Sequence, residues 1–200
     1  MKSKYWFLLS PLVLTGCAAA LVPYSSDPYQ MLANARSLFD QGRPMPAERL
    51  ITDALEICQT RQEPVCLAET YRTYGQFFMS SSLNGQWKSH YVQNGFRDRS
   101  ATYEGRGSKA LEYFDKAYPI LLEHKKYDGI TNIKLNSGFI YAAEKNKAKA
   151  CASFDESLAA NIENERLSPE ARVRLPDEYP TYKSFIDRVN QEFGCPESAT

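Results

Sequence analysis

One side-chain pattern occurs three times in this chain and limits what it can fold into. A small residue is followed four positions later by a large apolar residue, and three positions after that by another small one. The three copies are Ala47/Ile51/Ala54, Ala110/Phe114/Ala117 and Ala150/Phe154/Ser157. Spacings of four and three place side chains on one face of an α-helix. The sequence therefore predicts three amphipathic helices, each of which packs a stripe of alternating sizes against a neighbour.

A second small residue precedes two of these copies by twelve positions: Ala35 precedes Ala47, and Gly138 precedes Ala150. This phasing resembles that of the tetratricopeptide repeat (TPR), a helix-turn-helix unit of about 34 residues whose small residues let two helices approach. The resemblance implies an all-α fold, a short α-solenoid of about three TPR-like helical hairpins plus a C-terminal capping helix. It covers the following ranges: 28–61, 68–121 and 131–164.

The resemblance is one of side-chain sizes rather than of identical residues. Gly42 stands where the family has a glycine in the turn between its two helices. The usual tryptophan is replaced in the three units by Met31, Tyr71 and Lys134, and the proline that often ends a repeat is replaced by Gln59. The prediction therefore depends on the order of small and large residues.

The middle unit is interrupted by an insertion at about residues 80–107. Its first helix is predicted to end near Phe78, and its second helix begins only near Ser108. The insertion carries aromatic and basic side chains, namely Trp87, Lys88, His90, Tyr91, Phe96, Arg97, Arg99, Tyr103 and Arg106. Long loops inside compact domains are usually functional or disordered. Two interpretations stay open: the aromatic residues pack against the neighbouring helices, or the segment is a lid that contacts a ligand.

Apolar residues recur every three or four positions near the C-terminus, at Tyr179, Tyr182, Phe185, Ile186, Val189 and Phe193. Such a stripe is typical of a helix with one buried face. A solenoid needs a terminal helix to cover its last repeat. We therefore expect a capping helix here and a helical domain over residues 28–195.

Four cysteines lie within this domain, at Cys58, Cys66, Cys151 and Cys195. In an exported chain an even number suggests two disulfides, although four cysteines allow three pairings. Closeness in sequence favours Cys58 with Cys66, which leaves Cys151 with Cys195 to hold the capping helix. A zinc site is the alternative, but two cysteines never occur at C-x2-C spacing.

The N-terminus resembles a bacterial lipoprotein signal. Lys2 and Lys4 precede an apolar run that is too short to span a bilayer as a mature helix. The run ends in Leu14-Thr15-Gly16-Cys17, which resembles a lipobox. The resemblance implies removal of a lipoprotein signal peptide at residues 1–16 and attachment of palmitate and other acyl chains to Cys17. An ordinary signal peptide, with Cys17 left as a thiol, is the alternative.

Two further expectations follow from a lipid anchor at Cys17. Residues 17–27 would form a lipidated linker to the helical domain. By analogy with enterobacterial sorting, Ala18 rather than Asp after the cysteine implies an outer membrane location facing the periplasm. Two or more acyl chains give lasting membrane attachment. We therefore expect a protein of the bacterial cell envelope.

Charge and motifs argue against several classes of function. The chain has 24 basic and 24 acidic residues, so it lacks the basic excess that binding nucleic acid requires. His90 and His124 are the two histidines, and neither lies in a recognisable catalytic signature. Residues 105–110 fit G-x-G-x-x-A, but an apolar strand does not precede them. The sequence therefore predicts no enzyme, no metal site and no cofactor.

The repeat resemblance implies a binding module, because the first helices of stacked hairpins line a concave face. The family positions that face this groove correspond to Tyr29, Leu32, Arg36, Phe39, Arg72, Gln76, Met79, Leu135 and Phe139, and Trp87 is a further contact candidate in the insertion. We expect a membrane-anchored envelope scaffold that binds a protein or peptide partner and assists assembly of an envelope machine. Two alternatives remain: an enzyme that acts on envelope polymers around His90, and a periplasmic immunity or inhibitor lipoprotein.

Overall fold

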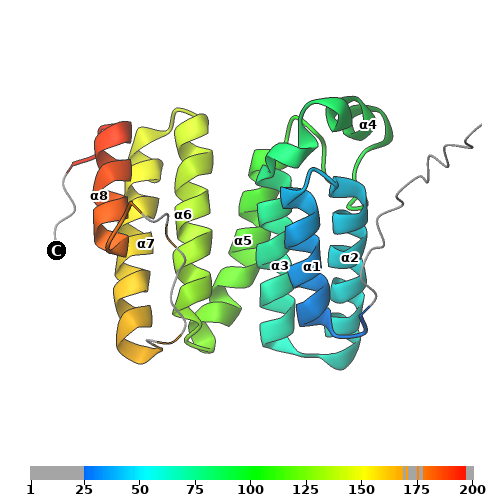
Figure 1. The fold of residues 1–200 in the computed structure, drawn as a ribbon, viewed down its shortest axis with the longest axis horizontal. Helices are drawn as coiled ribbons and strands as arrows, with labels where there is room; N and C mark the ends of the chain where they lie inside the picture. Colours follow the sequence, from blue (N-terminus) through cyan, green and yellow to red (C-terminus); the bar gives the residue numbers. More distant parts are fainter. Residues whose placement is uncertain (1–24, 169, 171–174, 176–177, 197–200) are drawn as a thin grey trace, which may run out of the picture.

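The computed structural model describes residues 25–168, 170, 175 and 178–196, and every regular element in this part of the chain is helical (Figure 1). The elements are α1 (Pro28–Asp40), α2 (Pro44–Arg61), α3 (Pro64–Met79), the 3-10 helix η1 (Ser81–Leu83), α4 (Gln86–Asn94), α5 (Arg106–Glu123), α6 (Tyr127–Ala143), α7 (Lys147–Leu167) and α8 (Tyr182–Phe193). The predicted signal peptide, the lipidation site Cys17 and the linker up to residue 24 lie outside the described residues. None of the described helices is long and apolar enough to cross a membrane.

The helices pair as three hairpins that follow one another along the long axis (Figure 1). α1 packs against α2, α3 against α5, and α6 against α7, while α8 packs against α7. The hairpins are stacked through α2 with α3 and through α5 with α6. The predicted all-α solenoid of three hairpins and a C-terminal capping helix is therefore confirmed.

Two glycines mark the places where paired helices cross closely. A Cβ atom at Gly75 of α3 would clash with the ring of Phe114 in α5. A Cβ atom at Gly138 of α6 would clash in the same way with Phe154 in α7. The small and large residues of the repeat pattern thus face each other within a hairpin, as their spacing predicts.

The turns between helices share one backbone geometry. Gly42 has φ +74°, and the amide of the next residue, Arg43, donates to the carbonyl of Leu38, which satisfies a carbonyl at the end of α1. Gln62, Lys125 and Lys145 adopt the same left-handed conformation at the ends of later helices, with φ between 53° and 60°. Glycine adopts this conformation without a steric penalty. Of these four turns, one uses glycine and three use residues with longer side chains.

The insertion is part of the core. Leu83, Tyr91, Phe96 and Tyr103 are each at most 5% exposed, and all four belong to the same apolar cluster as α1, α2, α3 and α5. Phe96 packs edge-on against Phe78, with ring centroids 5.0 Å apart. Of the two interpretations left open by the sequence, these side chains fit the packed segment.

The four cysteines of the helical domain form the two disulfides that sequence proximity favours. Cys58–Cys66 joins the last turn of α2 to the first turn of α3, and Cys151–Cys195 joins the first turn of α7 to the residue just after α8. In each pair the Cα atoms are 5.5 Å apart. The second bridge holds the capping helix on the last hairpin.

Candidate partner-binding groove and the polar network of the insertion

The first helices of the three hairpins, α1, α3 and α6, are neighbours in space, and we call them the inner row. Polar side chains connect each of these helices to the next. Arg36 of α1 donates from Nη1 to Thr73 Oγ1 of α3 at 2.8 Å. Gln76 of α3 donates from Nε2 to Asn132 Oδ1 of α6 at 2.6 Å, and Asn136 Nδ2 donates to the same oxygen at 3.2 Å. Amide, hydroxyl and guanidinium groups therefore link the three helices of the inner row, with the Thr73 hydroxyl buried and Arg36, Gln76, Asn132 and Asn136 half-buried.

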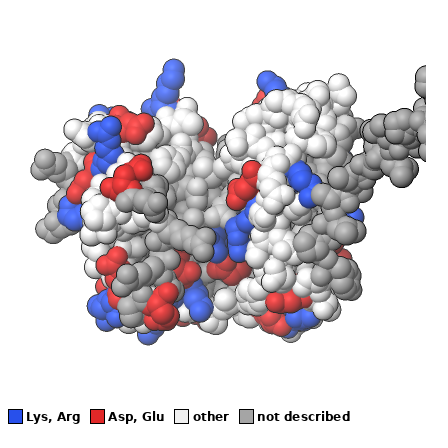
Figure 2. Space-filling model, viewed as in Figure 1, with Lys and Arg blue, Asp and Glu red and all other residues white. Residues whose placement is uncertain are grey.

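The inner row carries the guanidinium groups of Arg36 and Arg72 near the carboxylates of Glu69 and Asp40. Arg72 forms an ion pair with Glu69, and both side chains are less than one fifth exposed. Burial, together with the like charge of Arg72, lowers the pKa of Arg36. Figure 2 shows acidic and basic side chains together in the hollow between the two halves of the molecule. Charges of both signs, Arg36 and Arg72 with Glu69 and Asp40, therefore lie close together at the inner row.

A cavity of about 680 Å³ lies at one end of the inner row. It is lined by residues of α1, of α3, of the turn between α5 and α6, and of the end of α7 and the residues after it, namely Tyr29, Val65, Glu69, His124, Lys125, Lys126, Asp128, Leu167, Ser168 and Glu170. Tyr29 is 45% exposed, which leaves its ring accessible. Of the predicted contact residues, Tyr29, Arg36, Arg72 and Gln76 thus have polar groups on the inner row or beside this cavity.

Other predicted contact residues are buried by packing. Leu32 and Phe39 of α1 are 1% and 8% exposed, and the Phe39 ring lies 6.3 Å from that of Phe77. Their assignment to the groove is therefore corrected, because both fill the core between α1 and α3. Met79 is half-buried against the same core.

On α6, Leu135 and Phe139 are half-buried against the core of the last hairpin. The Phe139 ring packs on Phe154 and Phe193, with centroid distances of 5.4 Å and 6.2 Å. Phe139 thus links α6 to both α7 and α8, and only part of its surface is available to a partner.

Trp87 lies on α4, away from the inner row. Its Nε1 donates to the carbonyl of Gly42 at 3.0 Å, and its ring is half-buried against the core cluster. The contact ties α4 to the turn between α1 and α2. Trp87 therefore has a packing role in the structure, whether or not a partner also touches it.

Sequence reasoning missed the polar partners that complete the inner row. Glu69, Thr73, Asn132 and Asn136 belong to it, yet none matches a residue that the repeat pattern singles out. A signal was present, because Glu69, Thr73 and Gln76 recur every three or four positions along α3. Their contacts cross between helices and cannot be read from that spacing.

A buried carboxylate joins the insertion to the first two hairpins. Glu48 of α2 is only 3% exposed, and its Oε1 accepts hydrogen bonds from the Tyr74 hydroxyl at 2.9 Å and the Arg97 amide at 2.7 Å. Burial raises the pKa of Glu48, although these two hydrogen bonds oppose the shift. Burial and the nearby Glu48 in turn raise the pKa of Tyr74 and Tyr91.

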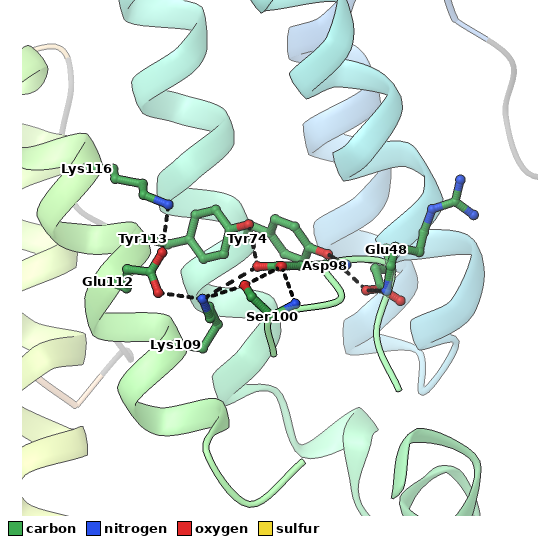
Figure 3. Close-up of polar contacts among 9 residues, drawn as sticks. Glu48, Tyr74, Asp98, Ser100, Lys109, Glu112, Tyr113 and Lys116 are labelled. Atoms are coloured by element: carbon green, nitrogen blue, oxygen red, sulfur yellow. Dashed lines mark hydrogen bonds and ion pairs between the residues drawn. The ribbon is translucent and has the colours of Figure 1, made fainter. Parts of the chain in front are cut away.

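Asp98 is the second acidic centre of this network (Figure 3). Its Oδ2 accepts from the Tyr113 hydroxyl at 2.9 Å, and its Oδ1 accepts from the amide and hydroxyl of Ser100. Lys109 Nζ lies 3.8 Å from Oδ2. Burial alone would raise the pKa of Asp98, but the Ser100 and Tyr113 hydrogen bonds and the charge of Lys109 hold it below its usual range.

Glu48 of α2 and Asp98 of the insertion already have partners from α3, α5 and the loop before α5, so the network holds the insertion in place. His90 and Glu48 do line one hollow of about 180 Å³, which is the juxtaposition that the enzyme alternative requires. However, Glu48 Oε1 is engaged by two donors in this arrangement. A general base must be within reach of the proton that it removes, so the geometry suits binding at this hollow better than proton abstraction by Glu48.

No protein-family model, curated protein or solved structure matches this chain.

Proposed function

We propose that this chain is an envelope scaffold, anchored to a membrane by lipid at Cys17, that binds an extended segment of a protein partner along α1, α3 and α6. The observation that carries the proposal is the line of polar side chains on the inner row, from Arg36–Thr73 to Gln76–Asn132. Carboxamides combine a donor and an acceptor, so they can pair with both the N–H and the C=O of a peptide backbone. Stacked helical hairpins commonly use such a face for binding.

Charge favours an acidic segment as the partner. Burial and the like charge of Arg72 disfavour the charge of Arg36, and the nearby carboxylates of Glu69 and Asp40 oppose this only in part. An additional carboxylate from a partner would relieve this repulsion and gain charge-assisted hydrogen bonds. A neutral or basic segment would gain neither.

The remaining features support an exported, anchored scaffold. The two disulfides are typical of proteins that fold in an oxidising compartment such as the bacterial periplasm. A lipid anchor at Cys17 would leave the linker 17–27, which can span roughly 40 Å at most. The groove would thus work close to the membrane surface, and the outer membrane facing the periplasm remains our proposed location. Assistance in assembling an envelope machine is the role that such a tethered groove suits.

The anchor and the groove are tested separately. Cys17→Ser should move the mature protein to the soluble envelope fraction, because the acyl chains that hold it are lost. If that variant stays on the membrane at the native level, another surface holds it and the anchor assignment is wrong.

The groove is tested by crosslinking the native full chain in envelopes and comparing it with Arg36→Gln and Gln76→Ala. Loss of a charge-assisted hydrogen bond should reduce capture of a specific partner about tenfold in the arginine variant. Arg49→Gln removes the same charge from an exposed position on α2 and is the matched control. A partner that is captured equally by all variants does not use the inner row and would count against the scaffold proposal.

A further inference from the structure

A second potential binding site lies outside the inner row, where the insertion meets α2. It is the hollow of about 180 Å³ already noted, and its lining includes Met45, Glu48, His90, Tyr91, Arg97 and Arg99. No residue of the inner row contributes to it. What this hollow binds is therefore a separate question from what the groove binds.

The two arginines of the hollow are held by neutral groups. Arg97 donates from Nε to Thr52 Oγ1 at 2.9 Å, and Arg99 donates from Nη1 to the Asn94 carbonyl at 2.9 Å. Within the described part of the chain neither guanidinium forms an ion pair, in contrast to Arg72 on the inner row. Each of them keeps further N–H donors, since a guanidinium carries five. These donors suit an anion, and the planar fork suits a carboxylate or a phosphate.

The carboxyl group of Glu48, which lines the hollow, discriminates between a carboxylate and a phosphate. Glu48 places a buried carboxyl group beside Arg97, whose amide donates to it at 2.7 Å and whose charge it lies close enough to feel. Like charges at short range disfavour each other. A phosphate that carries two charges meets more of this repulsion than a carboxylate that carries one. The arrangement therefore favours a single carboxylate.

Size and apolar surface limit the group attached to that carboxylate. A volume of 180 Å³ corresponds to about six water molecules at ~30 Å³ each, which is close to the size of one amino-acid residue. Met45 is 43% exposed, while Tyr91 and Phe96 are almost fully buried and form a firm apolar side. A short apolar group would contact these side chains while the carboxylate faces Arg97 and Arg99.

We propose that this hollow binds a small carboxylate about the size of one residue, with Arg97 and Arg99 holding the carboxylate and Met45 contacting the attached apolar group. The C-terminal residue of a peptide and a free small carboxylic acid share this chemistry. In either case the protein would have two binding sites, the inner row and this hollow at the insertion.

Titration of the full chain by calorimetry with four probes tests the ligand class. N-acetylalanine represents a peptide end, propionate a free acid, N-acetylalaninamide the same peptide end without its charge, and inorganic phosphate the dianion. We expect binding of N-acetylalanine or propionate, and the tighter of the two identifies the source. Equal binding of the amide, equal or tighter binding of phosphate, or no binding of either carboxylate overturns the proposal.

Substitutions test the location. Arg97→Gln and Arg99→Gln should each weaken carboxylate binding at least about tenfold, because each removes a charge-assisted hydrogen bond. Lys88→Gln removes the same charge from an exposed position of the insertion that does not line the hollow, and its affinity should match the native chain. Arg99→Lys, which keeps the charge, and thermal melting of every variant separate lost binding from lost folding. Native affinity in a folded Arg99→Gln variant overturns the assignment of the site.

Discussion

Two regions cover parts of the solenoid that its hairpins leave open, and they do so in different ways. α8 is a regular amphipathic helix that covers the last hairpin with Ile186 and Val189 and is bonded to α7 through Cys151–Cys195. The insertion at residues 80–107 covers the first two hairpins with irregular segments, buried aromatic rings and the Glu48–Asp98 network, and has no disulfide. The cap depends on a local stripe and a covalent bond, whereas the insertion depends on many long-range contacts.

The difference shows in the polar contacts of each region. At the cap, the Tyr182 hydroxyl lies 2.6 Å from Ser157 Oγ, which donates to the carbonyl of Thr131. Burial raises the pKa of Tyr182 to about 12, so this hydroxyl stays protonated at neutral pH. At the insertion, by contrast, the buried groups include a carboxyl, Glu48. A change of pH should therefore act on the insertion more than on the cap.

The largest expected effect tests whether the insertion is as much part of the core as the cap is. Phe96→Ala should lower the free energy of unfolding by about 3–5 kcal/mol, because the ring is 1% exposed and packs against Phe78. Ile186→Ala in α8 should cost about 2–5 kcal/mol for the same reason. Urea unfolding measures both. A loss below about 1 kcal/mol for Phe96→Ala would show that the insertion is not packed into the core and does not cover the first two hairpins as α8 covers the last.

The next largest effect concerns the close helix crossings at Gly75 and Gly138, which lie in the second and third hairpins. Gly75→Leu and Gly138→Leu should each cost about 1–3 kcal/mol or more, since the added side chain meets the ring of Phe114 or Phe154. Gly107→Ala is the control, because the new Cβ would lie 3.5 Å from Ile140 in ordinary contact. Equal stabilities for Gly107→Ala and Gly138→Leu would mean that the helices do not cross as closely as the contacts indicate.

The sequence predicted the repeat helices and the capping helix. The repeat phasing predicted a close helix crossing at Gly138, and the stripe from Tyr179 to Phe193 located the cap, whose helix begins at Tyr182, because both patterns are local to one or two helices. Cysteine spacing likewise gave the correct disulfides. The network was not predictable, because Glu48 and the Arg97 amide are 49 residues apart. The spacing within α2 gives Glu48 no partner, and its donors come from α3 and from the folded insertion.

The sequence indicated some residues of the candidate groove and misassigned others, because burial depends on contacts between helices. The repeat resemblance assigned Arg36, Arg72 and Gln76 to the inner row, and all three form polar contacts there. Helical phase did not reveal that Phe39 is covered by α3, since burial depends on the neighbouring helix.

Trp87→Ala tests whether this residue of the insertion stabilises the fold or contacts a partner. The ring is half-buried and Nε1 is bonded to Gly42, so we expect a loss of about 2 kcal/mol, below that of a fully buried aromatic residue. Partner capture by the folded fraction should then be unchanged. If stability is native while capture falls by about 2 kcal/mol, Trp87 is a binding hot spot and part of the insertion acts as a lid.

The pH dependence separates the two carboxylates of the insertion. The raised pKa of Glu48 means that the folded chain holds this proton more tightly, so stability from this group falls as pH rises above 4.5 through the folded value. The lowered pKa of Asp98 acts oppositely, since its contribution is present above about 3.9 and is lost as pH falls through the folded value.

Two isosteric variants measure these contributions by unfolding at several pH values. Glu48→Gln should be at least as stable as the native chain at pH 7, with the difference shrinking at low pH, because the amide oxygen still accepts hydrogen bonds. Asp98→Asn should cost about 1 kcal/mol at pH 7 and little in acid. Parallel pH profiles for Glu48→Gln and the native chain would contradict the raised pKa.

The smallest expected change in stability comes from left-handed residues in the turns between helices. Lys125 and Lys145 have φ values of 53° and 60°, a conformation that costs a residue with a Cβ about 1–2 kcal/mol. Glycine removes that cost but loses about 0.5–1 kcal/mol through the greater freedom of the unfolded chain. Lys125→Gly and Lys145→Gly should therefore raise the free energy of unfolding by about 0.5 kcal/mol each. Gly42→Ala, at φ +74°, should do the reverse, and a stability loss in both lysine variants would mean that these side chains contribute more than their backbone strain costs.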